Sequence, residues 1–209
     1  IIVITGDLID RNRTDLDAAM DLIRGIVKIA PVYYVSGNHE HQSGRYEDLV
    51  ELLTAEGVTI LDNGKSVIRR GEDTITLLGL ADKSVNPYYK SILHMLDKGL
   101  EDEFVLLLSH RPELFAEYAD AGISLVCSGH AHGGQIRLPW IGGLFAPHQG
   151  FFPPYTAGMY TMNETDMAVS RGLGNSTFPF RIGNRPELVV ITLCCKEDTP
   201  TMHRSKLSE

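Results

Sequence analysis

Short runs of β-branched and apolar residues alternate with helical patterns over the first part of the chain. The apolar residues between these runs recur at helical spacing, whereas the runs themselves are short enough to be single strands. This alternation is typical of α/β proteins, in which helices connect the strands of a sheet. We therefore expect an α/β fold. The strand-like runs are IIVIT from Ile1, VYYVS from Val32, TITLLGL from Thr74, FVLLLS from Phe104 and ISLVCS from Ile123.

Local signals mark where two of the connecting helices begin and end. Thr14 and Asp17 have the spacing of a capping box, and the apolar stripe that follows them continues until Pro31. A second helix is expected over residues 43–56, with Gly57 as its C-terminal stop.

Different patterns follow from Val58 onward. Asn63 and Gly64 stand between two alternating runs, which predicts a β-hairpin over residues 58–68 with a type I′ turn. Toward the C-terminus, strand-like runs follow one another without helices, so we expect the sheet system to end in antiparallel pairing. Two further helices are expected over 86–99 and 112–122, and the late strands over 158–163, 166–172 and 187–195.

The composition limits the domain count and excludes one class of partner. The chain has 209 residues and is 43% hydrophobic, so we expect one domain over residues 1–195 and a polar tail over 196–209. A net charge of −8 and the absence of any Lys/Arg cluster argue against binding along a nucleic-acid backbone, which requires phosphate neutralisation. No apolar stretch approaches the roughly 20 residues that span a bilayer.

Polar side chains directly follow four of the predicted strands. Ligands of α/β proteins gather at the carboxyl ends of strands, so these side chains are expected to meet. Each residue alone has a simpler interpretation, because Asp and Asn are common in turns and a histidine often has no special role. All the simpler interpretations would have to hold together, which favours one shared site. The motifs are Gly6-Asp7 with Asp10-Arg11, Gly37-Asn38-His39-Glu40, His110, and Gly129-His130-Ala131-His132.

The residue types at these strand ends match the preferences of a divalent metal. Aspartate carboxylates, asparagine carbonyls and neutral imidazoles bind ions such as Mn, Fe or Zn. The glycines beside them permit sharp backbone turns that direct the side chains inward. We therefore expect a metal site assembled from separate strands.

Four separated motifs resemble, in order and character, those of the calcineurin-like metallophosphoesterases. They are GDLIDRN, GNHE, a histidine directly after the next apolar strand, and GHAHGG, and they span Asp7 to Gln135. The closing VSRGLGNSTFPFRIGNRPELVVITL resembles a bacterial subgroup of that family, which extends the resemblance over nearly the whole chain. The resemblance implies a two-sheet α-β-β-α sandwich. It also implies a metal-dependent hydrolase of phosphomonoesters or phosphodiesters.

The resemblance further implies a role for each residue of the motifs. A hydroxide that bridges two metals would attack phosphorus, and His39 would act as general acid toward the departing oxygen, with Asp10 as its orienting partner. Arg11 would contact the phosphoryl group, although an exposed surface arginine is an equal alternative. Asp7 would bridge the two metals, Asn38, His110 and His130 would complete one of them, and His132 would bind the other.

One part of the family pattern is absent from the sequence. Family members begin with a strand that ends in Asp-x-His, which supplies two more ligands to the metal held by Asp7 and His132. The sequence opens inside an apolar run at Ile1 without an initiator Met, so we expect a fragment that lacks this first strand. The complete protein would hold two divalent ions, from among Mn, Fe, Zn and Mg. The fragment would hold one ion and be weakly active or inactive.

The segment 137–157 is long, apolar, and rich in glycine and proline. It either packs beneath another element or forms a lip beside the substrate, and the sequence leaves both open. The expected partner is a small phosphorylated substrate, with a lipid-linked phosphate and a nucleotide as the alternatives. Membrane association would come through residues before Ile1. A cytoplasmic or membrane-associated location in a bacterium is expected in preference to free secretion.

Three functions fit these observations. The first is a metal-dependent phosphoric ester hydrolase. The second is a non-catalytic binding scaffold with the same fold, which the absent Asp-x-His motif would fit. The third is a single-metal hydrolase of some other ester, which would bind one metal and be active in this chain. His39 and Asp10 favour the enzyme, because a scaffold has no chemical need for a general acid and its orienting partner.

Overall fold

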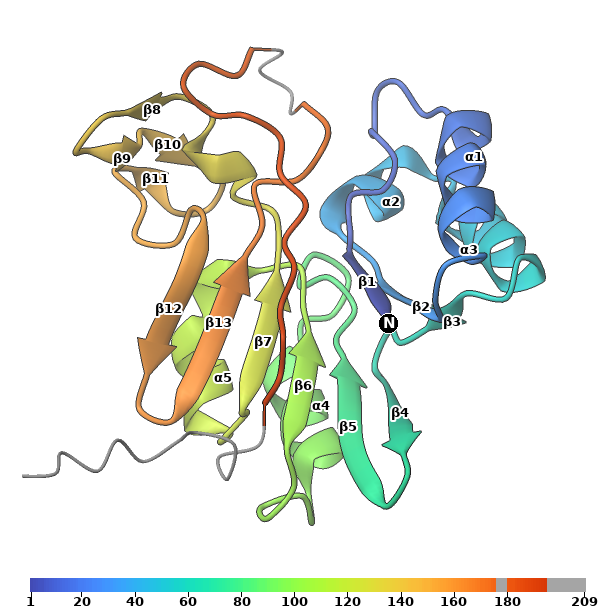
Figure 1. The fold of residues 1–209 in the computed structure, drawn as a ribbon. Coiled ribbons are helices and arrows are strands. Elements are labelled where there is room, and N and C mark those ends of the chain that lie inside the picture. Colours follow the sequence, from blue (N-terminus) through green and yellow to red (C-terminus); the bar gives the residue numbers. More distant parts are fainter. Residues whose placement is uncertain (176–179, 195–209) are drawn as a thin grey trace, which may run out of the picture.

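Figure 1 shows the computed structural model of the chain, in which residues 1–175 and 180–194 are described. Two β-sheets pack against each other, and helices cover their outer faces. The smaller sheet is parallel and has the strand order β1-β2-β3. Its strands are β1 (Ile2–Thr5), β2 (Val32–Val35) and β3 (Thr59–Ile60).

The larger sheet has the strand order β12-β13-β7-β6-β5-β4. Its inner strands run parallel, whereas β12 and β4 pair antiparallel at the two edges. The antiparallel pairing expected toward the C-terminus is confirmed by β12 and β13. The strands are β4 (Gly64–Arg70), β5 (Asp73–Gly79), β6 (Val105–Leu108), β7 (Leu125–Ser128), β12 (Gly158–Met162) and β13 (Thr165–Val169).

Helices α1 (Leu16–Ile26) and α3 (Tyr46–Ala55) cover the smaller sheet. Each helix carries one apolar stripe, so one face is buried and the other meets water. Ile23 of α1 and Leu53 of α3 are fully buried in the same cluster as Tyr34 of β2. Burying an aliphatic side chain of this size contributes about 1.5–3 kcal/mol, so this cluster holds the helices on the sheet.

Helices α4 (Tyr89–Asp97) and α5 (Phe115–Asp120) pack on the outer face of the larger sheet. A short 3₁₀ turn, η1 (Pro112–Leu114), leads into α5 and has proline at its first position. Every residue of β6 is buried, because helices cover one face of the sheet and the smaller sheet covers the other.

The inner faces of the two sheets share a third apolar cluster. It joins Val35 of β2 to Leu77 of β5, Leu108 of β6 and Cys127 of β7. Helix, sheet, sheet and helix therefore form successive layers, and the expected two-sheet sandwich is confirmed. A single domain over residues 1–195 stays a prediction, and the expected tail over 196–209 lies outside the described residues.

Two local predictions are wrong in position. The cap of α1 is Asp15, whose side chain accepts from the backbone of Ala18, because Thr14 instead donates its hydroxyl to the Asp10 carbonyl. The expected helix over 43–56 begins later, as α3, and a separate short helix, α2 (Asn38–Ser43), precedes it. The two helices are divided at Gly44, which has a left-handed backbone.

The hairpin predicted around Asn63-Gly64 is also wrong. Asn63 does turn the chain, with a φ of +56°, but the strands on its two sides belong to different sheets. Ile60 pairs with Tyr34 in the smaller sheet, whereas Gly64 pairs with Gly79 in the larger one. The turn therefore carries the chain from one sheet to the other.

The strand predicted over 187–195 is not formed in its described part. Residues 187–194 have no strand assignment, and Leu188, Val190 and Leu193 are exposed. No strand ladder of the described residues includes this segment, so its alternating pattern has no sheet neighbour against which to pack. Residue 195 lies outside the described residues.

No helix within 1–175 and 180–194 is long and apolar enough to cross a membrane. Cys127 and Cys194 are free thiols, the first buried in the core and the second exposed.

The fold places four strand ends close together. Figure 1 shows that the chain leaves β1, β6 and β7 at the same edge of the molecule, where α2 begins after β2. The four polar motifs follow these strands directly, so the topology itself assembles the site described next.

Candidate metal centre

The turn after β1 presents Asp7 to the site. Gly6 and Asp7 both have left-handed backbones, with φ of +88° and +54°, and this geometry reverses the chain immediately after the strand. Gly37, in the turn after β2, lies so close that a Cβ there would meet Asp7 Oδ1 at 2.3 Å. A glycine at this position therefore allows the two turns to touch.

Glu40 holds the two turns together. Its buried carboxylate accepts from the backbone of Asp7 at 3.0 Å, Leu8 at 2.6 Å and Gly37 at 2.8 Å. Burial and the nearby Asp7 charge raise the pKa of Glu40. Glu40 belongs to the GNHE motif, but no role was predicted for it. A carboxylate that binds backbone amides is recognised only in the folded chain.

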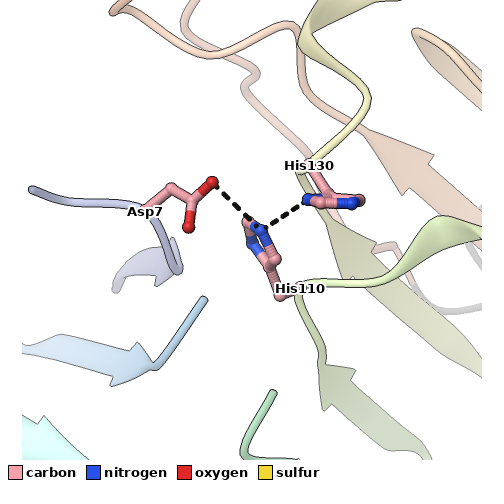
Figure 2. Close-up of side chains that lie close together, drawn as sticks. All are labelled: Asp7, His110 and His130. Atoms are coloured by element: carbon pink, nitrogen blue, oxygen red, sulfur yellow. Dashed lines mark hydrogen bonds and ion pairs between the residues drawn. The ribbon is translucent and has the colours of Figure 1, made fainter. Parts of the chain in front are cut away.

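His110 lies beneath the site at the end of β6. Its Nδ1 atom lies 2.7 Å from the Thr5 carbonyl, so the neutral ring donates there and leaves Nε2 unprotonated. Nε2 then faces Asp7 Oδ2 at 3.2 Å and His130 Nδ1 at 3.0 Å, as Figure 2 shows. Ligand atoms of Asp7, His110 and His130 all lie within 4.8 Å of one another.

Two buried oxygens at this site have no hydrogen-bond donor. Asp7 Oδ2 and Asn38 Oδ1 are both fully shielded from solvent and accept no hydrogen bond, although Asp7 Oδ2 lies 3.2 Å from His110 Nε2. Leaving such an acceptor unsatisfied costs about 1–3 kcal/mol, so a group that accepts their electron pairs would stabilise the site. Two oxygens and two imidazoles are a suitable ligand set for a borderline divalent cation. Asp7, Asn38, His110 and His130 therefore fit the expected ion.

The pKa shifts agree with this ligand set. Burial raises the pKa of Asp7, but the neighbouring His110 lowers it by more. The pKa of Asp7 therefore lies below its ordinary value, and Asp7 is an anion. Burial and the charges of His110 and Arg111 lower the pKa of His130, which keeps its ring neutral. The Asp7 charge outweighs burial at His110 and raises its pKa. A bound cation would replace the proton on that ring.

His132 lies at the edge of this group. It follows β7 in the 3₁₀ turn η2 (His132–Gly134), with a left-handed φ of +48°, and its side chain lines the same pocket as Asp7. It is not among the three residues whose ligand atoms converge. Burial lowers the pKa of His132 to about 4, so this ring is also neutral and able to bind a cation.

His39 and Asp10 lie together, as predicted. His39 Nδ1 is 3.3 Å from Asp10 Oδ2, and the other carboxylate oxygen accepts from the backbone of Asn12 and Arg13 at 2.8 Å each. Burial raises the pKa of Asp10, but these two amides and His39 bring it below its ordinary value. Asp10 is therefore an anion fixed beside the His39 ring.

Gln42 connects two predicted site residues and was missed by the sequence analysis. Its Oε1 atom accepts from Arg11 Nη1 at 2.8 Å and from Asn38 Nδ2 at 3.5 Å. Because the Asn38 amide nitrogen is bound to Gln42, its oxygen is turned away from Gln42. Asn38 and Gln42 are four residues apart in α2, and this helical spacing was the available signal.

Arg111, Asp82 and His148 were also missed. The Arg111 guanidinium forms a buried two-pronged ion pair with Asp82, at 2.6 and 2.8 Å. Its Nη1 atom also lies 2.7 Å from His148 Nδ1 and 3.0 Å from His130 Nε2. The position of Arg111 directly after His110 was a signal for proximity to the site.

His148 Nδ1 lies 2.9 Å from His130 Nε2 and accepts a hydrogen bond there when the His130 proton is on Nε2. In that tautomer His130 Nδ1 carries no proton and faces Asp7 and His110. A second group, Glu113, His130 and His148, also has converging ligand atoms. The Arg111 guanidinium contacts all three residues, so a positive charge is already present there and a metal is disfavoured.

A pocket of about 280 Å³ opens above these side chains. Four metal-ligand candidates line this pocket together with His39 and Arg11, namely Asp7, Asn38, His130 and His132. His110 does not line it and is only 1% exposed. The lining residues of the pocket are Asp7, Arg11, Asn38, His39, Gln42, His130, His132, Pro147 and His148.

Sequence comparison relates the chain to phosphoesterases. The calcineurin-like phosphoesterase family matches residues 1–134. The metallophosphoesterase YkuE of Bacillus subtilis is 36% identical over 199 residues, which are 92% of this chain and 67% of that protein. The phosphodiesterase YaeI of Escherichia coli is 28% identical over 199 residues, which are 92% of this chain and 70% of that protein.

A solved structure supports the fold. The Thermus thermophilus sulfate thiohydrolase SoxB superposes with a TM-score of 0.51 at 18% sequence identity. The match covers 74% of this chain, which spans only 30% of the SoxB chain.

Proposed function

The chain belongs to the calcineurin-like phosphoesterase family, and on that premise we propose that it hydrolyses a phosphomonoester or phosphodiester with His39 as general acid. The observation that carries the proposal is the convergence of Asp7, His110 and His130 beside two unpartnered buried oxygens. The name of the related phosphodiesterase YaeI is in keeping with an ester of this class.

Divalent ions bound at such a site would activate water and offset the charge of the phosphoryl oxygens. We propose that Asp7, Asn38, His110 and His130 hold one ion and that Asp7 and His132 contribute to a second. Mn, Fe, Zn and Mg are the candidate ions. The neutral imidazoles and ionised carboxylate described above are the forms that this role requires.

His39 supplies the proton that the departing oxygen needs. It lies in the pocket beside the ligand cluster without belonging to that cluster, so its proton is available to the ester. The Asp10 carboxylate, 3.3 Å from Nδ1 of the ring, would fix the orientation of His39 toward the ester. General acid catalysis of this kind contributes about 10²- to 10⁴-fold to a rate.

Arg11 binds the phosphoryl group in this proposal. Its side chain lines the pocket, and Gln42 holds one end of the guanidinium at 2.8 Å. The remaining N–H groups have the planar geometry that matches phosphate oxygens. If Arg11 has this role, its substitution lowers the affinity for substrate. If Arg11 is a surface arginine without a role, its substitution leaves that affinity unchanged.

The test is metal-dependent hydrolysis of bis-p-nitrophenyl phosphate and p-nitrophenyl phosphate, with p-nitrophenyl acetate as a carboxylic ester control. It is run on this chain and on a version that includes any residues encoded before Ile1. Metal-dependent turnover of a phosphoric ester by either version, lost in Asp7→Asn, supports the proposal. Absence of such turnover in both versions would leave a binding scaffold as the function.

A further inference from the structure

Residues 138–155 form a projecting lip beside the pocket, and we refer to them as the lip. Two short hairpins build it, and Figure 1 shows them at the edge of the molecule toward which β13 points. The first hairpin turns at Trp140 and the second at His148, both with left-handed backbones. Their strands are β8 (Arg137–Leu138), β9 (Gly142–Gly143), β10 (Phe145–Ala146) and β11 (Gly150–Phe151).

The lip presents its large apolar side chains to solvent. Trp140 is fully exposed, and Phe151 and Phe152 are 77% and 68% exposed. Ile141, Leu138 and Phe145 of the lip are also exposed, and the rings of Phe145 and Phe151 contact at 5.5 Å between centroids. Clustered exposed aromatic residues of this kind mark an interaction surface.

Internal contacts hold the lip in shape. The Gln149 side chain bonds the backbone of Tyr155 in both directions, at 2.8 and 2.9 Å. Tyr155 in turn packs on Phe115 of α5, which belongs to the main core. Gly134 and Gly143 approach too closely to admit a Cβ, which fixes the base of the lip. The exposed rings are thus carried by a framework whose base is tied to the core.

Charge separates the lip from the rest of the molecule. The chain carries a net charge of −8, yet no Asp, Glu, Lys or Arg occurs between Arg137 and Glu164. A neighbouring segment is bridged to Ile136 through Ile182 and carries the exposed Arg185. Arg181 of the same segment donates its guanidinium N–H groups to the carbonyls of Gly174 and Arg171. The acidic residues nearest in sequence lie at the β12–β13 turn, at the opposite end of those strands from the lip (Figure 1).

We propose that the lip inserts its aromatic tips into the interface of a lipid bilayer that contains anionic lipid. Trp and other aromatic side chains are favoured at the boundary between headgroups and acyl chains. The exposed Arg185 attracts anionic headgroups, and the lip itself carries no acidic residue to repel them. The charge of Glu113, which lies near His148, is offset by its ion pair with Arg111. Uncharged hairpin tips offer a protein partner no ion pair to fix its position, so they suit a fluid surface better.

The lip is continuous with the catalytic pocket. Pro147 and His148, at the tip of the second hairpin, line that pocket, and His148 contacts His130. A bilayer bound by Phe151 and Phe152 would therefore lie beside the pocket mouth. Combined with the proposed phosphoesterase activity, this arrangement favours phosphate esters that reside in the membrane interface. The docking itself does not depend on that activity.

Trp140 makes the test specific, because it is the only tryptophan in the chain. The experiment adds vesicles of equal parts phosphatidylcholine and phosphatidylglycerol to the chain and records tryptophan emission and acrylamide quenching. We expect a shift of the emission to shorter wavelength and reduced quenching. Binding through the exposed residues 188–193 would leave both signals unchanged, and unchanged signals overturn the proposal, including the case in which the lip binds a protein instead.

A pair of matched variants tests the phenylalanines. Phe151→Ser removes a residue that is 77% exposed, and Ile29→Ser removes one that is 76% exposed between α1 and β2, at the strand ends remote from the lip. We expect Phe151→Ser to lower vesicle binding in co-sedimentation by about tenfold or more, and Ile29→Ser to leave it unchanged. Equal losses in both variants would indicate non-specific adsorption and overturn the proposal. Because neither assay uses turnover, its outcome is independent of the phosphoesterase test.

Discussion

The Nδ1 atom of His110 lies 2.7 Å from the carbonyl oxygen of Thr5, and this contact joins the ends of two strands from different sheets. Thr5 ends β1 in the smaller sheet, whereas His110 follows β6 in the larger one. The contact also directs Nε2 of His110 toward Asp7. The candidate metal centre therefore depends on how the two sheets pack, and substitutions that change that packing are expected to change metal affinity.

Gly37→Ala tests the close contact between the turns after β1 and β2. A Cβ at Gly37 would meet Asp7 Oδ1 at 2.3 Å and His110 Cε1 at 2.9 Å, so Asp7 must move. We expect the affinity for Mn²⁺ to fall by about tenfold or more and the free energy of unfolding to fall by about 1–3 kcal/mol. Calorimetric titration and urea denaturation measure the two quantities.

Gly25→Ala is the matched control for this substitution. Gly25 lies within α1, and a Cβ there would meet nothing within 4 Å. Alanine is favoured over glycine inside a helix by about 0.5–1 kcal/mol, so this variant should unfold at slightly higher urea with unchanged metal affinity. A comparable loss of Mn²⁺ affinity in both variants would contradict the role given to Gly37.

Gln42→Ala tests the positioning of Asn38. Without the Gln42 acceptor, the amide of Asn38 is free to rotate and its oxygen is no longer fixed. Loss of an outer partner of this kind typically lowers metal affinity by about 10- to 100-fold. Gln42→Glu keeps the acceptor oxygen and should retain most of the affinity. The prediction is wrong if Gln42→Ala binds Mn²⁺ as tightly as Gln42→Glu.

His39→Gln tests the general acid. We expect turnover of an alkyl phosphoester to fall by about 10²- to 10⁴-fold, with metal affinity unchanged, because His39 is outside the ligand cluster. The loss should be much smaller for p-nitrophenyl esters, whose leaving group departs without a proton. Asp10→Asn should give a smaller loss with the same dependence on the leaving group. Equal losses for alkyl and p-nitrophenyl esters would assign His39 a different role.

Asp82→Asn tests the buried ion pair beside the site. Its Arg111 partner is 4% exposed, so the variant leaves a buried guanidinium without its charge partner, at a cost of about 3–5 kcal/mol. Asp48→Asn, which breaks an exposed pair with Arg45, should cost no more than about 1 kcal/mol. Urea denaturation at neutral pH compares the two variants.

The same pair also predicts a pH dependence. Burial raises the pKa of Asp82, but the bonds to Arg111 lower it more, so the folded pKa lies below the ordinary value of 3.8. The stability contributed by Asp82 is therefore fully present above pH 3.8 and is lost as the pH falls through the lower folded value. The difference in stability between the wild-type chain and Asp82→Asn should shrink only below pH 3.8. A difference that is already declining between pH 7 and pH 5 would contradict this assignment.

The sequence predicted that these polar side chains would lie close together, because strand ends are a reliable meeting point in α/β proteins. Asp7, His110 and His130 each directly follow a strand, and no knowledge of loop paths was needed to place them together. His148 was not placed because the lip reaches the pocket through two short hairpins whose course depends on tertiary packing. For the same reason, the sequence could not decide whether the long apolar segment packs beneath another element or projects from the molecule. In the structure this segment projects.

Local turn chemistry was a weaker guide to pairing. Asn63 adopts the left-handed backbone that a turn requires, but the two flanking strands, β3 and β4, pair in different sheets. The turn residues therefore do not determine the strand pairing. Thr14 and Asp15 are both able to cap a helix. The Thr14 hydroxyl donates a hydrogen bond to the Asp10 carbonyl, and Asp15 therefore caps the helix. Such competition between neighbours is decided by three-dimensional contacts.

The most direct test of the metal centre is a calorimetric titration of the chain with Mn²⁺, compared with Asp7→Asn and His110→Gln. We expect tight binding by the wild-type chain and an affinity lower by at least about 100-fold in each variant, with circular dichroism confirming that both remain folded. Tight binding retained by either folded variant would contradict a centre built on these two residues.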